Sequence, residues 1–278
     1  MSEDETMADK RSTLKQGQID ILELLYKYRF GSRQLLADSL GIKAGSSLHE
    51  KLQVFIKHGY IAMRLEKKLK LHGTPAAYYL TPKGLRTLAA LPDHDYITDS
   101  MIKGSYKDST VTQPFVTQTL RVYAQANRLT VAYPNLKVFL RRDMSRYSYF
   151  PKPLPDAFLS LPISKGTPLK RFFLDVIPDS LPTKPLYQRI TSYAEFFDEG
   201  GWERVSDEPP ILLLTCETGT TERRVRRAVK AALYKAETDV DIIAFTSTFG
   251  AVQNIEENGA IWTSLDDPDE LLSLPEIE

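Results

Sequence analysis

Apolar residues recur at helical spacing in the first part of the chain. The stretch GQIDILELLYKYRF predicts an amphipathic helix whose apolar face contains Ile19, Leu22, Leu25, Tyr26 and Phe30. The stretch SRQLLADSLG predicts a second helix, with Ser32 as its N-cap and Gly41 at its end. After a short turn, SSLHEKLQVFIKHGYI predicts a third helix, capped by Ser46 or Ser47. Its apolar face contains Leu48, Leu52, Phe55 and Ile56.

The pattern changes to that of paired strands after the third helix. AMRLEKKLKL and AAYYLTPKG are separated by a turn at residues 72–75 and predict a hairpin that runs into another helix. The expected order of helix, helix, helix, strand, strand and helix is that of a winged helix-turn-helix domain over residues 15–92. The stretch YYLTPKGLRTL resembles the strand-to-helix exit of many bacterial winged-helix DNA-binding proteins.

A winged helix places its third helix in the major groove of DNA and the tip of its hairpin on the phosphate backbone. The residues expected in the groove are therefore Lys43, Ser46, Ser47, His49, Glu50, Lys51 and Gln53. The lysines expected to neutralise phosphates are Lys67, Lys68 and Lys70. Edge strands also contain lysine to avoid pairing with other sheets, and some winged helices bind protein, so those explanations stay open.

The distribution of charge favours a polyanionic partner for this first segment. The whole chain is neutral, with 36 basic and 36 acidic residues. Residues 10–90, however, contain 15 Lys or Arg and 5 Asp or Glu, an excess of 10 positive charges. Such asymmetry is typical of a basic module that binds nucleic acid, joined to a module with another task. We therefore expect double-stranded DNA as the partner of the first domain.

The rest of the chain alternates short apolar runs with helical stretches. Residues 93–110 combine turn formers with both signs of charge and predict a linker. A helical stretch, VTQPFVTQTLRVYAQANRL, then begins an α/β domain with a mixed sheet over residues 111–265. The expected strands are 136–140, 157–161, 171–177, 211–216 and 241–245, and the expected helices between them are KPLYQRITSYAEFFDEG and TTERRVRRAVKAALYKAET. The fold class of the whole chain is therefore α+β.

Two aspartates occupy comparable places in neighbouring predicted strands. Asp156 opens the strand at 157–161, and Asp175 lies inside the strand at 171–177. Two carboxylates on adjacent strands can converge on one divalent cation, which activates water and stabilises the charge of a scissile phosphate. With the element order, PDAFL and FFLDVI resemble the core of the PD-(D/E)xK nuclease fold. The resemblance implies a restriction-endonuclease-like domain, with both aspartates catalytic and binding Mg²⁺ or Mn²⁺.

The combination of motifs is similar to one family. A winged helix with YxLTxxG, followed by PDAFL, FFLDV and YQRITSYAEFF, resembles the replication-relaxation family of plasmids and other mobile elements. The resemblance implies a DNA-binding protein that acts in replication or conjugative mobilisation, beside other proteins of those processes. The family pattern has Glu-x-Asp in the third strand and a lysine four residues before a tyrosine. Here the strand has Asp175 and Ile177, and Arg189 stands four residues before Tyr193.

These departures bear on whether the protein holds DNA or cuts it. Arg189 could stabilise phosphate charge as a forked donor, but its guanidinium stays protonated and cannot act as a general base. Asp179 is a candidate replacement for the missing acid, although a proline bends the path to it. The sequence therefore favours a degenerate, non-cleaving core. A metal-dependent nicking relaxase or endonuclease using Asp156, Asp175 and Arg189 is the alternative, and a winged-helix transcriptional regulator is a more distant one.

Three other features of the sequence bear on possible chemistry. The predicted helix over residues 222–235 is rich in arginine, and Arg223 and Arg227 either contact DNA phosphates or coat the outer face of the helix. Only four histidines are present, none after His94, which excludes a histidine-cage relaxase, and CETGTTERR lacks the Gly-Lys-Ser/Thr of a phosphate loop. The single cysteine, Cys216, is expected to be a buried, inert thiol.

The chain ends and the hydropathy complete the expectations. Residues 1–14 are expected to be a disordered tail, and residues 266–278 an acidic tail. The longest apolar runs are far shorter than the roughly 20 residues of a membrane helix, so no membrane insertion is expected. The start, MSEDETMADKRS, lacks an apolar stretch, so we expect a cytoplasmic protein. Apart from the divalent cation no cofactor is expected, and nothing in the sequence sets the oligomeric state.

Overall fold

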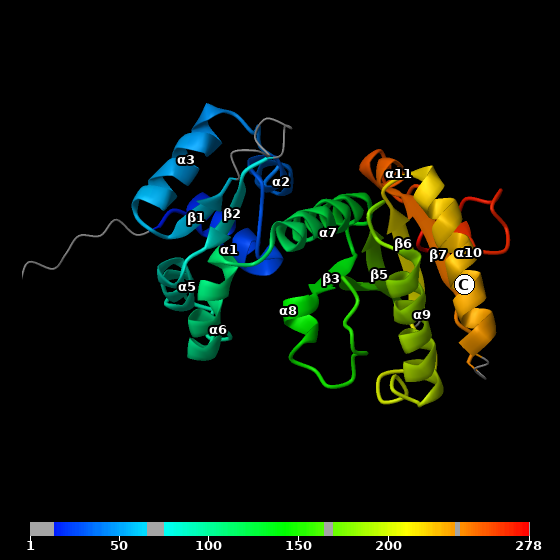
Figure 1. The fold of residues 1–278 in the computed structure, drawn as a ribbon. Coiled ribbons are helices and arrows are strands. Elements are labelled where there is room, and N and C mark those ends of the chain that lie inside the picture. The colour runs from blue at the N-terminus through cyan, green and yellow to red at the C-terminus, as the bar shows by residue number, and fades with distance from the viewer. Residues whose placement is uncertain (1–13, 66–74, 164–168, 237–239, 278) are drawn as a thin grey trace, which may run out of the picture. The chain divides into compact units, whose positions relative to one another are not determined.

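The computed structural model describes residues 14–65, 75–163, 169–236 and 240–277. The chain divides into two compact units, Met1–Val111 and Thr112–Glu278 (Figure 1). Its class is α+β, as expected, because helices accompany a hairpin in the first unit and a larger mixed sheet in the second. Within the described ranges, no helix has the length and apolar character needed to span a lipid bilayer.

The first unit is built of helices around one hairpin. Its elements are α1 (Gln16–Tyr28), α2 (Arg33–Ser39), α3 (Ser46–Lys57), β1 (Ile61–Arg64), β2 (Ala77–Leu80), α5 (Pro82–Ala89), α6 (Asp99–Gly104) and the 3-10 helix η1 (Ser105–Ser109). Up to α5 this is the order expected from the sequence. β1 and β2 pair antiparallel, with Ile61 opposite Leu80. The apolar faces of the first three helices meet in one core that includes Leu22, Leu25, Leu36, Leu48, Leu52 and Phe55.

The helix ends follow the predicted capping chemistry, with one correction. Ser32 accepts a hydrogen bond from the backbone N–H of Leu35 (3.2 Å), and Gly41 follows α2 with a φ of 63°. The N-cap of α3 is Gly45, however, so Ser46 and Ser47 are its first helical residues and not its caps. Glycine is itself an accepted N-cap residue, and its use leaves both serines on the exposed surface.

The stretch YYLTPKG forms a tight junction between β2 and α5. Thr81 is the N-cap of α5 and accepts a hydrogen bond from the N–H of Gly84 (3.1 Å), while its hydroxyl donates to the carbonyl of Gly59 (2.6 Å). Pro82 begins the helix, where its missing N–H costs nothing. A β-carbon at Gly84 would come within 2.0 Å of the carbonyl oxygen of Tyr60. The motif thus holds α5 against the turn that precedes β1.

The segment expected as a linker, residues 93–110, is structured and belongs to the first unit. It contains α6 and η1, and Ile97 and Ile102 are buried in the core of that unit. Asp108 is buried as well and forms an ion pair with Arg29 (2.6 Å). A helix of this length is too short to show a clear apolar period, so the turn formers around it dominate the sequence pattern.

The second unit contains one sheet and the helices on its two faces. Its elements are α7 (Gln113–Ala132), β3 (Lys137–Leu140), α8 (Arg141–Met144), β4 (Ala157–Leu161), β5 (Lys170–Ile177), α9 (Thr183–Asp198), β6 (Ile211–Cys216), α10 (Gly219–Ala236), β7 (Ala244–Thr248), α11 (Phe249–Gln253) and β8 (Thr263–Ser264). The described strands lie in the order β3-β4-β5-β6-β7-β8. β5, β6 and β7 are parallel and the other neighbours antiparallel, so the expected mixed sheet is confirmed.

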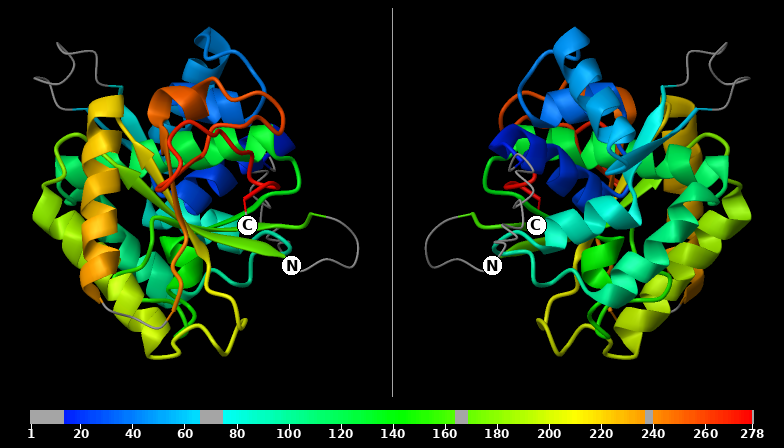
Figure 2. Two further views of the ribbon diagram at one scale, coloured as in Figure 1. Left: turned by 90° about the vertical axis from the view of Figure 1, so that its right-hand side faces the viewer. Right: turned by 90° about the vertical axis from the view of Figure 1, so that its left-hand side faces the viewer.

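α9 and α10 lie side by side on one face of this sheet (Figure 2). The crossovers β5-α9-β6 and β6-α10-β7 advance in the same direction, and crossovers of one hand then place both helices on the same face. Phe173 and Ile177 of β5 point to this face and pack in one core with Ile190 of α9 and Val225 of α10. Leu174 points the other way, to the face where α7 contacts β3 and β5.

The C-terminal segment, expected as an acidic tail, packs on the second unit. Trp262 and Leu272 exchange backbone hydrogen bonds (3.0 and 2.8 Å), and Leu274 and Ile277 are buried. The backbone N–H of Leu274 also donates to the hydroxyl of Tyr133 (3.3 Å). The segment is acidic, but the burial of a few apolar side chains is enough to hold it on the second unit. Composition alone does not show which side chains will be buried. The tail expected at residues 1–14 lies outside the described residues except for Leu14.

Candidate functional site

The two candidate aspartates meet at one edge of the sheet. The carboxyl ends of the parallel strands β5, β6 and β7 lie at this edge, and β4, which is antiparallel to β5, begins there. Ala157 stands opposite Leu174, so that Asp156, immediately before β4, lies beside Asp175. In open α/β sheets, ligands bind outside the carboxyl ends of the strands. The structure thus brings the predicted acids together where a site is expected.

Asp175 is buried in β5, with 2% of its side chain exposed, and both of its carboxylate oxygens are occupied. Arg189 of α9 donates to it twice, from Nε to Oδ2 (2.5 Å) and from Nη2 to Oδ1. The hydroxyl of Tyr193 donates to Oδ2 (3.0 Å), and the backbone N–H of Asp156 donates to Oδ1 (3.1 Å). The pair between Arg189 and Asp175 is therefore a forked, charge-assisted interaction, the strongest type of hydrogen-bonded ion pair.

Asp156 is held in a similar way by other elements. Its Oδ1 accepts a hydrogen bond from Nη2 of Arg141 (2.8 Å), the first residue of α8. Its Oδ2 accepts from the backbone N–H of Val176 (2.9 Å) and from the side-chain amide of Gln118 in α7 (3.2 Å). We call Asp156, Asp175, Arg141 and Arg189 together the clamp, because their side chains connect β4, β5, α8 and α9.

Burial and mutual charge set the protonation of these groups. Burial raises the pKa of Asp156, the negative charge of Asp175 raises it further, and the two arginines of the clamp oppose the shift. Burial, and then the charge of Asp175, raise the pKa of Tyr193 well above its usual range. Burial by itself would lower the pKa of Arg189, but Asp175 outweighs it and holds the guanidinium protonated. Tyr193 is consequently a hydrogen-bond donor and not a phenolate nucleophile.

This arrangement does not fit a Mg²⁺ or Mn²⁺ site. Such ions bind carboxylate oxygens directly, but the guanidinium of Arg189 already occupies both oxygens of Asp175. Ile177, at the position of the missing acid, is buried in the apolar core beneath α9 and α10. Among the residues that the structure describes, no group of three or more His, Cys, Asp or Glu side chains is placed to hold a metal ion. An arginine supplies the positive charge that a cation would bring.

Asp179, the candidate replacement acid, belongs to a different network. It is exposed, and its Oδ1 accepts hydrogen bonds from the hydroxyls of Thr218 (2.9 Å) and Thr221 (2.5 Å). The bond from Thr221 makes the largest contribution to lowering the pKa of Asp179. The backbone N–H of Asp179 donates to Glu217 (2.8 Å), which pairs with Arg121 (2.7 Å). Asp179 thus connects the end of β5 to the start of α10 and does not join the clamp.

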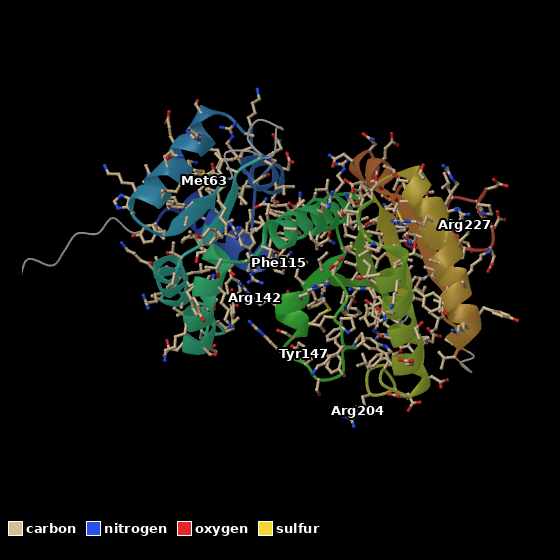
Figure 3. All side chains as sticks on the ribbon, viewed as in Figure 1. Met63, Phe115, Arg142, Tyr147, Arg204 and Arg227 are labelled. Carbon is tan, nitrogen blue, oxygen red and sulfur yellow. The ribbon has the colours of Figure 1, made fainter. Side chains whose placement is uncertain are left out.

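The residues predicted to contact DNA fall into three groups. Those of the first unit that the structure describes are all exposed, in the turn before α3 or on α3 itself: Lys43, Ser46, Ser47, His49, Glu50, Lys51 and Gln53. The three lysines expected on a wing, Lys67, Lys68 and Lys70, lie outside the described residues. Arg223 and Arg227 are exposed on α10, and Arg227 is labelled on its outer face in Figure 3. Contact of any of these residues with DNA stays a prediction.

Sequence reasoning missed Arg141 and Gln118. Arg141 lies in the stretch FLRRDM, where the change from strand to helix is too short to show in the apolar pattern. Gln118 lies on α7 among residues that are partly or fully buried, and a glutamine there was the one available signal of a buried polar partner. Both pair with Asp156 across a large separation in the sequence, which no local pattern predicts.

No protein-family model, curated protein or solved structure matches this chain in the comparisons made with each. The resemblance of its motifs to the replication-relaxation family therefore stays an expectation from the sequence.

Proposed function

We propose that the protein binds double-stranded DNA through its first unit, a winged helix-turn-helix domain, and that it acts in the replication or mobilisation of a plasmid or other mobile element without cutting the DNA. The observation that supports this most is the division of α3 into two faces. Leu48, Leu52 and Phe55 hold the helix on the core, while its polar residues are exposed. A helix that is fixed on one side and offers hydrogen-bonding groups on the other suits the major groove.

The side chains on the exposed face of α3 have the chemistry of base and phosphate contacts. Lys51 and Gln53 can donate hydrogen bonds to base edges, and glutamine can pair with adenine through two of them. Ser46 and Ser47 lie in the first turn, where hydroxyls and free backbone N–H groups suit phosphate oxygens. The excess of positive charge in residues 10–90 adds attraction to DNA that does not depend on its sequence.

The second unit, in this proposal, is a restriction-endonuclease-like core that has exchanged its metal site for the clamp. The support is that donors occupy both oxygens of Asp175 and both oxygens of Asp156. A catalytic cation would have to displace Arg189 and leave a buried guanidinium without its partner, at a large cost in free energy. The acid pair therefore stabilises the fold and no longer binds a cation.

Removal of the two central groove residues is expected to weaken duplex binding. A preferred duplex would first be selected from a random pool with the unmodified protein, and its affinity measured by fluorescence anisotropy. Lys51→Ala with Gln53→Ala should lower that affinity at least about tenfold, because one good base contact is worth about 1–3 kcal/mol. Matched control changes are Lys184→Ala with Gln188→Ala, an exposed lysine and glutamine on α9.

The control double variant should bind the selected duplex within about twofold of the unmodified protein. Equal losses in the two double variants would mean that charge alone and not α3 determines binding. Full affinity after the changes in α3 would contradict the proposed role of the first unit.

The same protein is expected to leave supercoiled plasmid intact in the presence of Mg²⁺ or Mn²⁺. The plasmid should contain the selected duplex, so that failure to bind does not explain an absence of nicking, and a known nicking enzyme serves as the positive control. Nicking by the unmodified protein that disappears in Asp156→Asn would contradict the proposal and establish the metal-dependent enzyme. Binding without nicking would agree with a core that only holds DNA.

A further inference from the structure

A surface beside the clamp contains basic and aromatic side chains that the proposed function does not use. Residues 141–152, which form α8 and the start of the loop to β4, contain four basic residues, Arg141, Arg142, Arg146 and Lys152. The single acid of the segment, Asp143, accepts a hydrogen bond from the backbone N–H of Leu140 (2.9 Å), the N-cap residue of α8. Basic side chains therefore outnumber acidic ones in this segment, and Arg141, Arg146 and Lys152 are exposed.

A series of neighbouring aromatic rings connects this surface to the core of the second unit. Tyr147, labelled in Figure 3, is 51% exposed, and its ring lies 5.2 Å from that of Tyr149 at an angle of 32°. Tyr149 lies 4.9 Å from Phe150, which in turn packs at 5.8 Å from Trp202. Phe150 and Trp202 are buried in the core of the second unit. The exposed ring of Tyr147 is thus the outer end of a packed series of rings.

We infer that this surface binds a single-stranded segment of nucleic acid, with one base stacked on Tyr147 and with Arg141, Arg146 and Lys152 beside the phosphates. Arg146 and Lys152 are exposed on either side of the tyrosine in the sequence, and Arg141 is 48% exposed although it pairs with Asp156. Proteins that bind single strands combine a basic surface with aromatic rings on which bases stack. A ring that is already packed loses little conformational entropy when a base covers it.

The chemistry of the surface favours a single strand over a duplex or a protein. The faces of paired bases are covered by their neighbours, so only an unpaired base can stack on the ring of Tyr147. Arg141 pairs with Asp156, but Arg142, Arg146 and Lys152 still outnumber Asp143 in this segment, and such an excess of positive charge matches a polyanion better than it matches a protein partner. The inference rests on the proposed function, because the first unit would bring this surface to DNA, where replication and transfer expose single strands.

The test is the affinity of the full-length protein for a fluorescein-labelled oligothymidylate of about 15 nucleotides, measured by anisotropy at low ionic strength. Tyr147→Ala should weaken binding about tenfold, the loss expected for one stacked base, whereas Tyr147→Phe keeps the ring and should bind within about twofold. Tyr234→Ala is the matched control, since Tyr234 is 90% exposed on the basic helix α10. It should also bind within about twofold.

Binding of the selected duplex, measured in parallel, separates this inference from the proposed function. Tyr147→Ala should keep full duplex affinity, while Lys51→Ala with Gln53→Ala should lose duplex affinity and keep affinity for the oligothymidylate. Unchanged binding of the single strand by Tyr147→Ala, or an equal loss in Tyr234→Ala, would overturn the inference. Failure of the unmodified protein to bind the oligothymidylate would also overturn the inference. A protein would then be the better candidate for the partner of this surface.

Discussion

Replacement of Arg189 by alanine is expected to lower the free energy of unfolding of the second unit by about 3–5 kcal/mol. The change leaves the carboxyl group of Asp175 buried without its guanidinium partner, and the hydroxyl of Tyr193 and the backbone N–H of Asp156 are then its donors. Both tryptophans of the chain, Trp202 and Trp262, belong to the second unit. Tryptophan fluorescence during urea denaturation therefore measures the unfolding of this unit alone.

Two further variants distinguish the clamp from a general effect of losing an arginine. Arg227→Ala removes an exposed arginine from the neighbouring helix α10 and should change the free energy of unfolding by less than about 0.5 kcal/mol. Arg189→Lys keeps the charge but loses the fork, so its stability should lie between those of Arg189→Ala and the unmodified protein. A loss of less than about 1 kcal/mol in Arg189→Ala would show that Asp175 does not need the clamp.

If the second unit is the nuclease-like core proposed above, the clamp also explains why it would not cut DNA. Two carboxylates side by side in a buried place repel each other unless positive charge compensates them. A divalent cation is one solution, and it leaves a site that can activate water. Arg141 and Arg189 are another, since each donates to one carboxylate and neither can act as a base. In that proposal, the two arginines keep the acids together on their strands without a cation that activates water.

Local patterns predicted most of the elements and the pairing of the two acids. The apolar periods of α1, α2, α3, α9 and α10 are long enough to specify helices, and short apolar runs bounded by turns specify the strands. The same pattern predicts that Asp156 and Asp175 lie close together. One acid is at the start of a strand and the other is inside its neighbour, so pairing of the two strands brings them side by side. Arg189 was expected beside them only through the resemblance to the replication-relaxation family, whose pattern has a lysine four residues before a tyrosine where this chain has Arg189 and Tyr193.

What the sequence did not predict depends on contacts between distant segments. The sequence does not specify the state of the acid pair, because the family resemblance aligns Arg189 with a lysine near the site but does not say that two of its donors point to Asp175. Residues 93–110 and the C-terminal segment were expected to be a linker and a tail, yet Ile102 and Ile277 are buried. Each of these segments has a few apolar residues among polar ones. Only tertiary packing determines whether such a segment is buried or stays exposed.

Replacement of Gly84 by alanine is expected to destabilise the first unit by about 3 kcal/mol. The new β-carbon would lie 2.0 Å from the carbonyl oxygen and 2.9 Å from the carbonyl carbon of Tyr60, and backbone atoms cannot turn away as a side chain can. The same carbonyl accepts hydrogen bonds from the N–H of Thr81 (3.0 Å) and from its hydroxyl (3.1 Å). Any shift that relieves the clash therefore also weakens the cap of α5.

Gly17→Ala is the matched control for this change in the same unit. Gly17 lies on α1 with no atom within 4 Å of an added β-carbon, so alanine there should be neutral or stabilising by up to about 1 kcal/mol. Hydrogen exchange of the backbone amides of α1 and α3 measures the stability of the first unit, while tryptophan fluorescence should show an unchanged second unit. Equal protection of α3 in the two variants would contradict the tight junction at Gly84.

The same pair of variants connects the YYLTPKG motif to function. If the first unit binds the duplex, Gly84→Ala should lower duplex affinity in proportion to the fraction of this unit that is unfolded, because only the folded unit presents α3. A moderate rise in temperature should then weaken duplex binding by Gly84→Ala well before it affects Gly17→Ala. Duplex affinity that stays constant while α3 loses its protection would show that binding does not depend on the folded first unit, and would move the DNA-binding surface to the second unit.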